Sequence, residues 1–164
     1  MKRHVVHPYS PVIHQESKVL ILGTVPSLKS IENGFYYGHP QNRFWRIMSY
    51  LFNVDFVNAS IKEKQKYLLA NNVALYDVVY SCDIDGSDDN KITNIVPIDL
   101  DNLLKNTKIK HIFLNGQSCF KIFKKYFPHY LGIVSVLPSS SPRNVSYNFE
   151  KLIERWKEIL NYCK

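Results

Sequence analysis

The sequence predicts an α/β fold, a three-layer α/β/α sandwich around a central, mainly parallel four-stranded sheet. Two observations predict it: short apolar segments alternate with amphipathic ones, and turn residues or charges bound each apolar segment. Strands that alternate with helices favour parallel pairing, because each helix returns the chain to the same edge of the sheet. The chain has 164 residues, 45% of them hydrophobic, and we expect a single domain over 1–164.

The first strand and the first helix are predicted from short local signals. Residues 19–22 are wholly apolar and end at Gly23, which is typical of a buried parallel strand that opens into a loop. A helix is predicted over 40–52, because Pro40 is tolerated at a helix start and apolar residues follow at helical spacing.

The remaining elements follow from the same two patterns, with Ser60 as an N-cap of the helix that it precedes. In chain order they are a helix over 60–71, a strand over 73–76, a helix over 99–105, a strand over 109–114, a helix over 117–127, a strand over 133–137 and a helix over 146–162. Ligands of such a sheet gather at the carboxyl ends of the strands, so we expect the functional site in the loops that follow them.

Composition limits the class of protein. The chain carries 21 Lys and Arg against 14 Asp and Glu, a formal net charge of +7, which favours a polyanionic partner such as DNA but also fits an ordinary basic protein. Its 3 cysteines form no CxxC pair, so we expect no metal, iron–sulfur cluster or other cofactor. With no signal-peptide pattern and no apolar run of transmembrane length, we expect a soluble, cytoplasmic monomer.

An acidic stretch lies over 83–90 (DIDGSDDN). It could bind a cation, but it lacks the Glu that a calcium loop has at its twelfth position. A solvated loop is the favoured interpretation.

Residues 34–45 (GFYYGHPQNRFW) combine aromatic, imidazole, amide and guanidinium groups. Aromatic faces stack on a flat ring and amides bind its edge, so the segment predicts a pocket for a ligand like a nucleobase. Within it, Phe35, Phe44 and Trp45 are expected to be core residues.

Three motifs resemble the uracil-DNA glycosylase superfamily. Residues 23–27 (GTVPS) are similar to its first motif, G-x-x-P-x, and 137–142 (LPSSSP) to its second, x-P-S, which contacts DNA. Residues 38–45 (GHPQNRFW) are similar to the mismatch-specific and hypoxanthine-DNA glycosylases. With 74–79 (ALYDVV) and the pair Gly86 and Ser87 in order between the motifs, the resemblance covers about residues 18–145.

Two departures from the superfamily pattern indicate one branch. The third position of the first motif commonly holds the Asp or Asn that serves the attacking water, but here it is Val25. The second motif often begins with a His that stabilises the departing uracil, but here it begins with Leu137. Both departures are features of the hypoxanthine-DNA glycosylase branch, which implies that Asn42 is the catalytic residue. Asn42 is expected to position the water; otherwise its amide binds the helix backbone.

The resemblance and the strand-end positions suggest a set of base-binding residues. Tyr37 lies twelve residues after Val25, where mismatch-specific relatives place an aromatic ring on the flipped base. Thr24 and Val25, in the first motif, are also expected beside the base. Asp77 could accept the N1–H of hypoxanthine or cap the next turn, and His39 could bind the base, bind a phosphate or fix its own loop.

The loop 138–144 is expected to contact DNA phosphates and to enter the gap left by the extruded nucleotide. The residues assigned to DNA binding are Ser139, Ser140, Ser141, Arg143 and Asn144, with Ser27 of the first motif. A surface turn would have the same composition. For Asn115, at the end of a predicted strand, a turn is favoured over a place in the pocket wall.

The sequence leaves three functions open. The first, which is favoured, is a monofunctional glycosylase that flips deoxyinosine out of DNA, hydrolyses its glycosidic bond and leaves an abasic site. The second is a uracil or mismatch glycosylase of the same superfamily. The third, motivated by Val25 and Leu137, is a protein that binds damaged DNA without catalysis.

Overall fold

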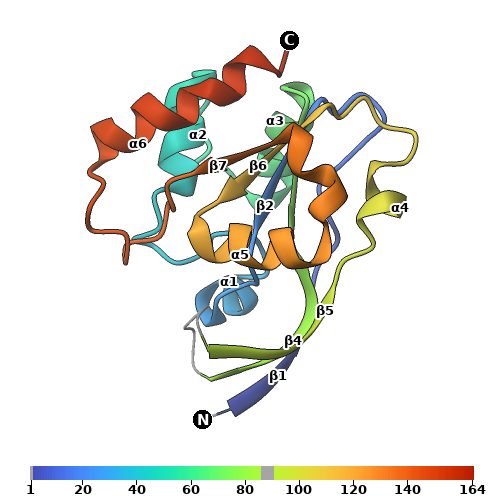
Figure 1. Ribbon diagram of the computed structural model, residues 1–164. Helices are drawn as coiled ribbons and strands as arrows, with labels where there is room; N and C mark the ends of the chain where they lie inside the picture. The colour runs from blue at the N-terminus through green and yellow to red at the C-terminus, as the bar shows by residue number, and fades with distance from the viewer. Residues whose placement is uncertain (1, 86–90) are drawn as a thin grey trace.

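The computed structural model describes residues 2–85 and 91–164 and contains two β-sheets (Figure 1). The larger sheet is parallel throughout, with strand order β3-β2-β6-β7. Its strands are β2 (Val19–Gly23), β3 (Val73–Asp77), β6 (His111–Asn115) and β7 (Val134–Leu137). All four predicted strands are confirmed, with ends that differ by one or two residues.

Helices cover both faces of this sheet. They are α1 (Leu28–Asn33), α2 (Phe44–Phe52), α3 (Ile61–Ala70), α4 (Leu100–Leu104), α5 (Gln117–Tyr126) and α6 (Phe149–Trp156), with the 3₁₀ helices η2 (Pro128–Ile133) and η3 (Lys157–Asn161). Helices α2 and α6 lie on one side of the sheet and α5 lies on the other (Figure 1). The predicted three-layer α/β/α fold is therefore confirmed.

The central strand β2 divides its side chains between two cores, because successive strand residues point to opposite faces. Val19 and Ile21 pack into a core with apolar residues of α2, α3 and α6. Leu20 and Leu22 pack into a second core with residues of α4 and α5. All four are fully buried, which explains the unbroken apolar run in the sequence.

Two predicted helix boundaries are wrong. The helix predicted over 40–52 begins at Phe44, because Pro40 lies in a turn and the Asn42 side chain accepts the first helical N–H. The helix predicted over 146–162 begins at Phe149 and tightens into a 3₁₀ helix at Lys157. Helix α1 and η2 were not predicted.

A second, antiparallel sheet was also not predicted. Its strands are β1 (Lys2–Val6), β4 (Val79–Asp85) and β5 (Ile92–Pro97), in the order β1-β4-β5. Strand β4 begins two residues after β3 ends, so the chain passes directly from one sheet to the other. This corner brings the start of the chain next to the carboxyl end of β3.

The acidic stretch is only partly described. Asp83 accepts hydrogen bonds from Asn94 at 2.7 Å and contacts His4 Nδ1 at 2.8 Å. Residues 86–90 of this stretch, which include the pair Gly86 and Ser87, lie outside the described residues. No described helix combines the length and the apolar composition that crossing a membrane requires.

Candidate active site

A cavity of about 870 Å³ lies at the carboxyl ends of the parallel strands. Its lining includes the last residues of all four strands, which are Gly23, Asp77, Asn115 and Leu137. The volume is within the range of ligand pockets, and the position is the one that parallel sheets use for their ligands.

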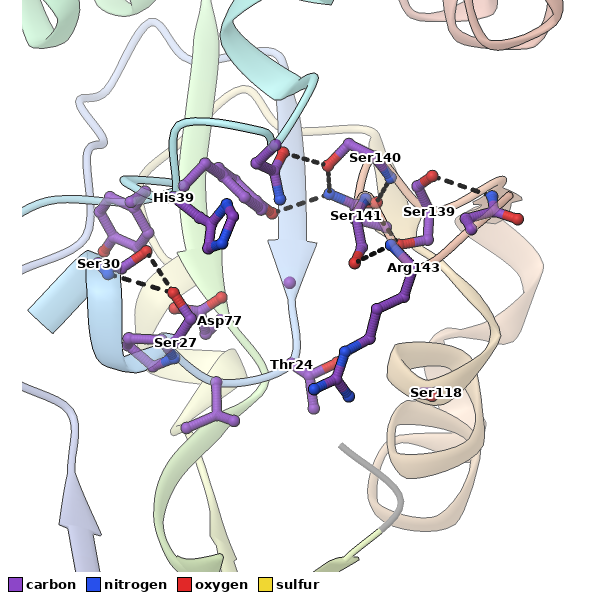
Figure 2. A pocket seen from close by; sticks show the side chains of 18 of the residues that line it. Thr24, Ser27, Ser30, His39, Asp77, Ser118, Ser139, Ser140, Ser141 and Arg143 are labelled. Carbon is purple, nitrogen blue, oxygen red and sulfur yellow. Dashed lines mark hydrogen bonds between the residues drawn. The ribbon is translucent and has the colours of Figure 1, made fainter. Parts of the chain in front are cut away.

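Every site residue predicted from the sequence lines this cavity, although the residues come from separate segments of the chain. They are Thr24, Val25, Ser27, Tyr37, His39, Asn42, Asp77, Ser139, Ser140, Ser141, Arg143 and Asn144. Figure 2 shows Ser27, Ser30 and Asp77 on one side and the serines of the 139–141 segment with Arg143 on the other.

The amide of Asn42 is held in one orientation. Its Oδ1 accepts a hydrogen bond from the backbone N–H of Phe44 at 2.9 Å and another from the hydroxyl of Ser140 at 2.9 Å. A backbone N–H can only donate, so the atom facing Phe44 is the oxygen. Both lone pairs of Oδ1 are therefore used. No described residue accepts a hydrogen bond from Nδ2, which is left to donate to a ligand.

A buried chain of hydrogen bonds supports Asn42. Asn115 accepts the backbone N–H of Ser140 at 2.9 Å through Oδ1, so its Nδ2 donates to the Ser140 hydroxyl at 3.0 Å. That hydroxyl in turn donates to Asn42. Ser140 is fully buried, so its side chain orients Asn42, and the sequence had assigned it to DNA contact. Asn115 lines the pocket wall, where the sequence had favoured a turn.

Tyr37 combines a packed ring with a polar tip in the pocket. One face of the ring stacks on Phe44, with centroids 4.1 Å apart and planes 20° apart. Its hydroxyl accepts a hydrogen bond from Asn115 Nδ2 at 3.1 Å and keeps its own proton for donation. Burial, and then the charge of Asp77, raise the pKa of Tyr37 well above its ordinary value, so the hydroxyl stays protonated. Its backbone φ is +54°, an uncommon conformation for a bulky residue.

Gly23 brings its backbone close to two pocket side chains. A Cβ at this position would lie 2.5 Å from Asp77 Oδ1 and 2.8 Å from the Tyr37 hydroxyl. Only a residue without a side chain allows this approach. Asp77 and Tyr37 therefore converge over the end of β2.

Asp77 is paired with a residue that the sequence did not assign to the site. Its Oδ2 lies 2.8 Å from Nε2 of His7, and both side chains are buried. The sequence contained no signal for this contact, because His7 is seventy residues away and follows a strand that was not predicted.

Arg43 holds the 139–147 loop to the start of α2. Its guanidinium donates to the backbone carbonyls of Ser141 at 2.7 Å and Asn144 at 3.1 Å, and also to those of Ser140 and Tyr147. We call this set of hydrogen bonds from Arg43 to the carbonyl groups of the loop the Arg43 clamp. The exposed side chain of Arg143 is not part of it. The sequence had given Arg43 no role.

The other loop residues have mainly local partners. The Ser139 hydroxyl accepts the N–H of Ser141 at 3.1 Å, and Asn144 Nδ2 donates to the carbonyl of Ser139 at 3.0 Å. Ser141 accepts the N–H of Arg143 at 3.2 Å. These contacts give the loop a defined turn next to the pocket.

Ser27 and His39 also contact their own segments. Ser27 is the N-cap of α1 and accepts the N–H of Ser30 at 3.1 Å. The Ser30 hydroxyl accepts the N–H of Gly38 at 2.9 Å, which ties the first motif to the 34–45 segment. Nδ1 of His39 accepts the N–H of Gln41 at 3.1 Å.

The predicted core residues of the 34–45 segment are confirmed: Phe35, Phe44 and Trp45 are buried. Within 2–85 and 91–164, no group of three or more His, Cys, Asp or Glu side chains could hold a metal ion.

A model of a known protein family matches most of the chain. The model described as the Uracil DNA glycosylase superfamily matches residues 11–163. This segment includes all three motifs on which the resemblance rested.

Two curated relatives carry the name hypoxanthine DNA glycosylase. The protein from Methanosarcina acetivorans is 30% identical over 158 residues, which is 94% of this chain and 97% of that protein. The protein from Methanosarcina barkeri is 32% identical over 111 residues, 66% of this chain and 70% of that protein.

A solved structure has the same fold. It is a solution NMR structure of a candidate uracil DNA glycosylase from Methanosarcina acetivorans, with a TM-score of 0.78 and 30% identity. The superposition covers 92% of this chain and 93% of that one.

Proposed function

Because this chain belongs to the Uracil DNA glycosylase superfamily, we propose that it excises hypoxanthine from deoxyinosine in DNA and leaves an abasic site. The observation that carries the proposal is the polarity of the pocket. Asn42 offers an N–H donor from one side and Asp77 offers an oxygen acceptor from another. Hypoxanthine has acceptor atoms on its ring and a donor at N1. The names of the two Methanosarcina relatives support the same substrate.

The reaction breaks the bond between C1′ of the sugar and N9 of the base. The bonding electrons leave with the base, the sugar becomes an oxocarbenium-like cation, and a water oxygen then bonds to C1′ and loses a proton. A late-attacking water needs little activation, because the cation is a strong electrophile. The enzyme therefore gains most by stabilising the departing base and the positive sugar.

The donor role of Asn42 fits this requirement. An amide that positions water for attack would use its oxygen, but both lone pairs of Oδ1 are already occupied. We infer that Nδ2 donates to a ring nitrogen of hypoxanthine as negative charge develops there. This differs from the water-positioning role expected from the sequence. In this role Asn42 supplies what the second motif lacks at Leu137, a group that stabilises the departing base.

Asp77 and Tyr37 recognise the base in this proposal. Asp77 Oδ1 accepts the N1–H, and the Tyr37 hydroxyl is a donor within the same pocket. Because Phe44 covers one face of the Tyr37 ring, the flipped base stacks on the other face. Thr24 and Val25 form the neighbouring wall, and His39 holds the loop that carries Asn42.

The loop 139–144 contacts the DNA backbone in this proposal. Arg143 is exposed and free of the Arg43 clamp, which suits it to a phosphate or to the space left by the extruded nucleotide. The formal charge of +7 favours the same partner. Ser139, Ser141 and Asn144 belong to the same loop, and Ser27 faces them from the other side of the pocket. The protein is proposed to act as a monomer in the cytoplasm.

A panel of duplexes tests the proposal. Single-turnover excision is measured on identical duplexes that contain hypoxanthine, uracil, xanthine or a mismatched thymine, followed by alkaline cleavage of abasic sites. We expect the highest rate with hypoxanthine. A higher rate with uracil would make this a uracil glycosylase, and binding without any excision would make it a non-catalytic binder.

A further inference from the structure

The antiparallel sheet positions His7 beside the pocket. His7 follows β1 directly, and its backbone N–H donates to the carbonyl of Tyr80 in β4 at 2.7 Å. Strand β4 begins two residues after Asp77, so the register of β1 on β4 sets the imidazole beside that carboxyl. The His7 side chain is fully buried, and the Asp77 side chain is 5% exposed.

The hydrogen bonds of His7 define where its protons lie. Nδ1 is 2.8 Å from the backbone carbonyl of Tyr9, which can only accept, so Nδ1 carries a proton. Nε2 is 2.8 Å from Oδ2 of Asp77. A contact of this length between two basic atoms requires one proton between them. The pair is either imidazolium with carboxylate or imidazole with carboxylic acid.

Both forms leave the same atom for the ligand. In the first form Asp77 has no proton, and in the second its proton lies on Oδ2 toward His7. Oδ1 is therefore an acceptor in either case. It is the atom that approaches the end of β2 at Gly23.

We propose that His7 is a specificity-determining positioning residue, which fixes Asp77 Oδ1 as a permanent hydrogen-bond acceptor. The pocket then accepts a purine with an N–H at position 1, as in hypoxanthine, and rejects adenine, whose N1 is itself an acceptor. Because adenine is the normal base from which hypoxanthine arises by deamination, this contact distinguishes damaged from intact DNA. The inference rests on the proposed function and extends it to a residue before the first motif.

The surroundings of the pair make His7 necessary. Its ring packs against Tyr9, Tyr36 and Tyr76, with centroids 5.1, 5.9 and 4.6 Å away. Burial, and then the charge of Asp77, raise the pKa of all three phenols, so they stay neutral. Without His7, Asp77 Oδ2 loses the partner that fixes the carboxyl, so Oδ1 is no longer held as the acceptor that faces the pocket. The discrimination against adenine should then weaken.

The test compares affinities for duplexes that contain non-cleavable 2′-fluoro analogues of deoxyinosine and deoxyadenosine. In His7→Phe, which keeps an aromatic ring, we expect the deoxyinosine preference to fall by about tenfold or more. His4→Phe is the matched control, because His4 is an exposed histidine of β1, three residues before His7, and contacts Asp83. It should keep the wild-type preference. An unchanged preference in a folded His7→Phe protein would overturn the proposal.

A second variant covers the case in which His7→Phe does not fold. In Asp77→Asn, the new amide donates to Nε2 of neutral His7 and turns its oxygen toward the pocket. We expect the deoxyinosine preference to stay within about threefold of wild type, since one hydrogen-bond acceptor replaces another. In the double variant with His7→Phe the amide can turn either way, and the preference should fall. Loss of the preference in Asp77→Asn alone would contradict the assignment.

NMR of the ¹⁵N-labelled wild-type protein tests the proton positions without any activity. Nδ1 of His7 should carry a proton, and an unprotonated Nδ1 would overturn the proposal. Excision of deoxyinosine by the wild-type protein is measured in a separate experiment. If the wild type excises it but the variants keep their preference, only the role of His7 fails; if the wild type excises nothing, the proposed function fails.

Discussion

The backbone N–H of Phe44 donates to Oδ1 of Asn42 across 2.9 Å, and this bond decides which end of the amide meets a ligand. Phe44 is the first residue of helix α2. The hydrogen bond at the junction of the loop and α2 therefore also orients Nδ2 of Asn42, the donor that we propose to act on the base.

Asn42→Asp should lower the single-turnover rate on deoxyinosine by about 100-fold or more, the usual effect of losing a donor to developing charge. The variant keeps the oxygen that Phe44 and Ser140 bind, but it replaces the N–H donor with a second oxygen. Asn148→Asp is the matched control, because Asn148 caps α6 through its oxygen and Asp caps equally well. A rate that stays high or rises in Asn42→Asp would instead indicate that the side chain accepts from water.

Ser140→Ala should lower the excision rate by about tenfold and the free energy of unfolding by about 1–3 kcal/mol, because the change leaves buried polar groups unpaired. The hydroxyl is bonded to both Asn42 and Asn115 and is inaccessible to DNA. Kinetics and urea denaturation measure the two effects. Ser49→Ala, which removes the acceptor of the Phe56 N–H in another loop, should reduce stability without changing the rate. An excision rate equal to that of the wild type in Ser140→Ala would show that Ser140 does not contribute to catalysis.

Arg43→Lys should weaken DNA binding and lower the melting temperature. A lysine cannot reproduce the fork of donors that Arg43 gives to the carbonyls of the 139–147 loop. We expect a loss of about 1–3 kcal/mol in unfolding free energy, measured by thermal and chemical denaturation. Arg46→Lys in the first turn of α2 is the control, since Arg46 is exposed and lies over the ring of Phe149. Equal effects of the two substitutions would argue against the clamp.

Gly23→Ala should abolish most of the activity while the protein stays folded. The added methyl would displace Asp77 and Tyr37, the two side chains that converge over this backbone. Displacements of this size in an active site commonly reduce rates by about 100-fold. Gly132→Ala is the control, because nothing lies within 4 Å of a Cβ at that position. An active Gly23→Ala enzyme would mean that the base is bound elsewhere in the cavity.

The parallel sheet and its helices could be predicted because their signals are local. An apolar run such as 19–22 identifies a strand buried on both faces, and the Ser60 signal corresponds to a real capping box with Glu63. The antiparallel sheet was missed for the opposite reason. Strand β1 is short and polar, and what stabilises it is pairing with β4 nearly eighty residues away.

The same distinction applies to the site. Asn42, Tyr37 and Asp77 could be identified because they belong to motifs or strand ends. Ser140 could be placed near the site but not assigned its buried role, since burial depends on how its loop packs. The contact of His7 with Asp77 has no local signal at all.

Strand β1 of the antiparallel sheet places His7, near the start of the chain, against Asp77 in the pocket. The segment matched by the family model starts at residue 11, four residues after His7. A protein trimmed to that segment would keep every motif and still leave the Asp77 carboxyl without its imidazole. Domain boundaries drawn from sequence similarity alone would therefore remove the residue that we propose to fix Asp77 as a hydrogen-bond acceptor for the base.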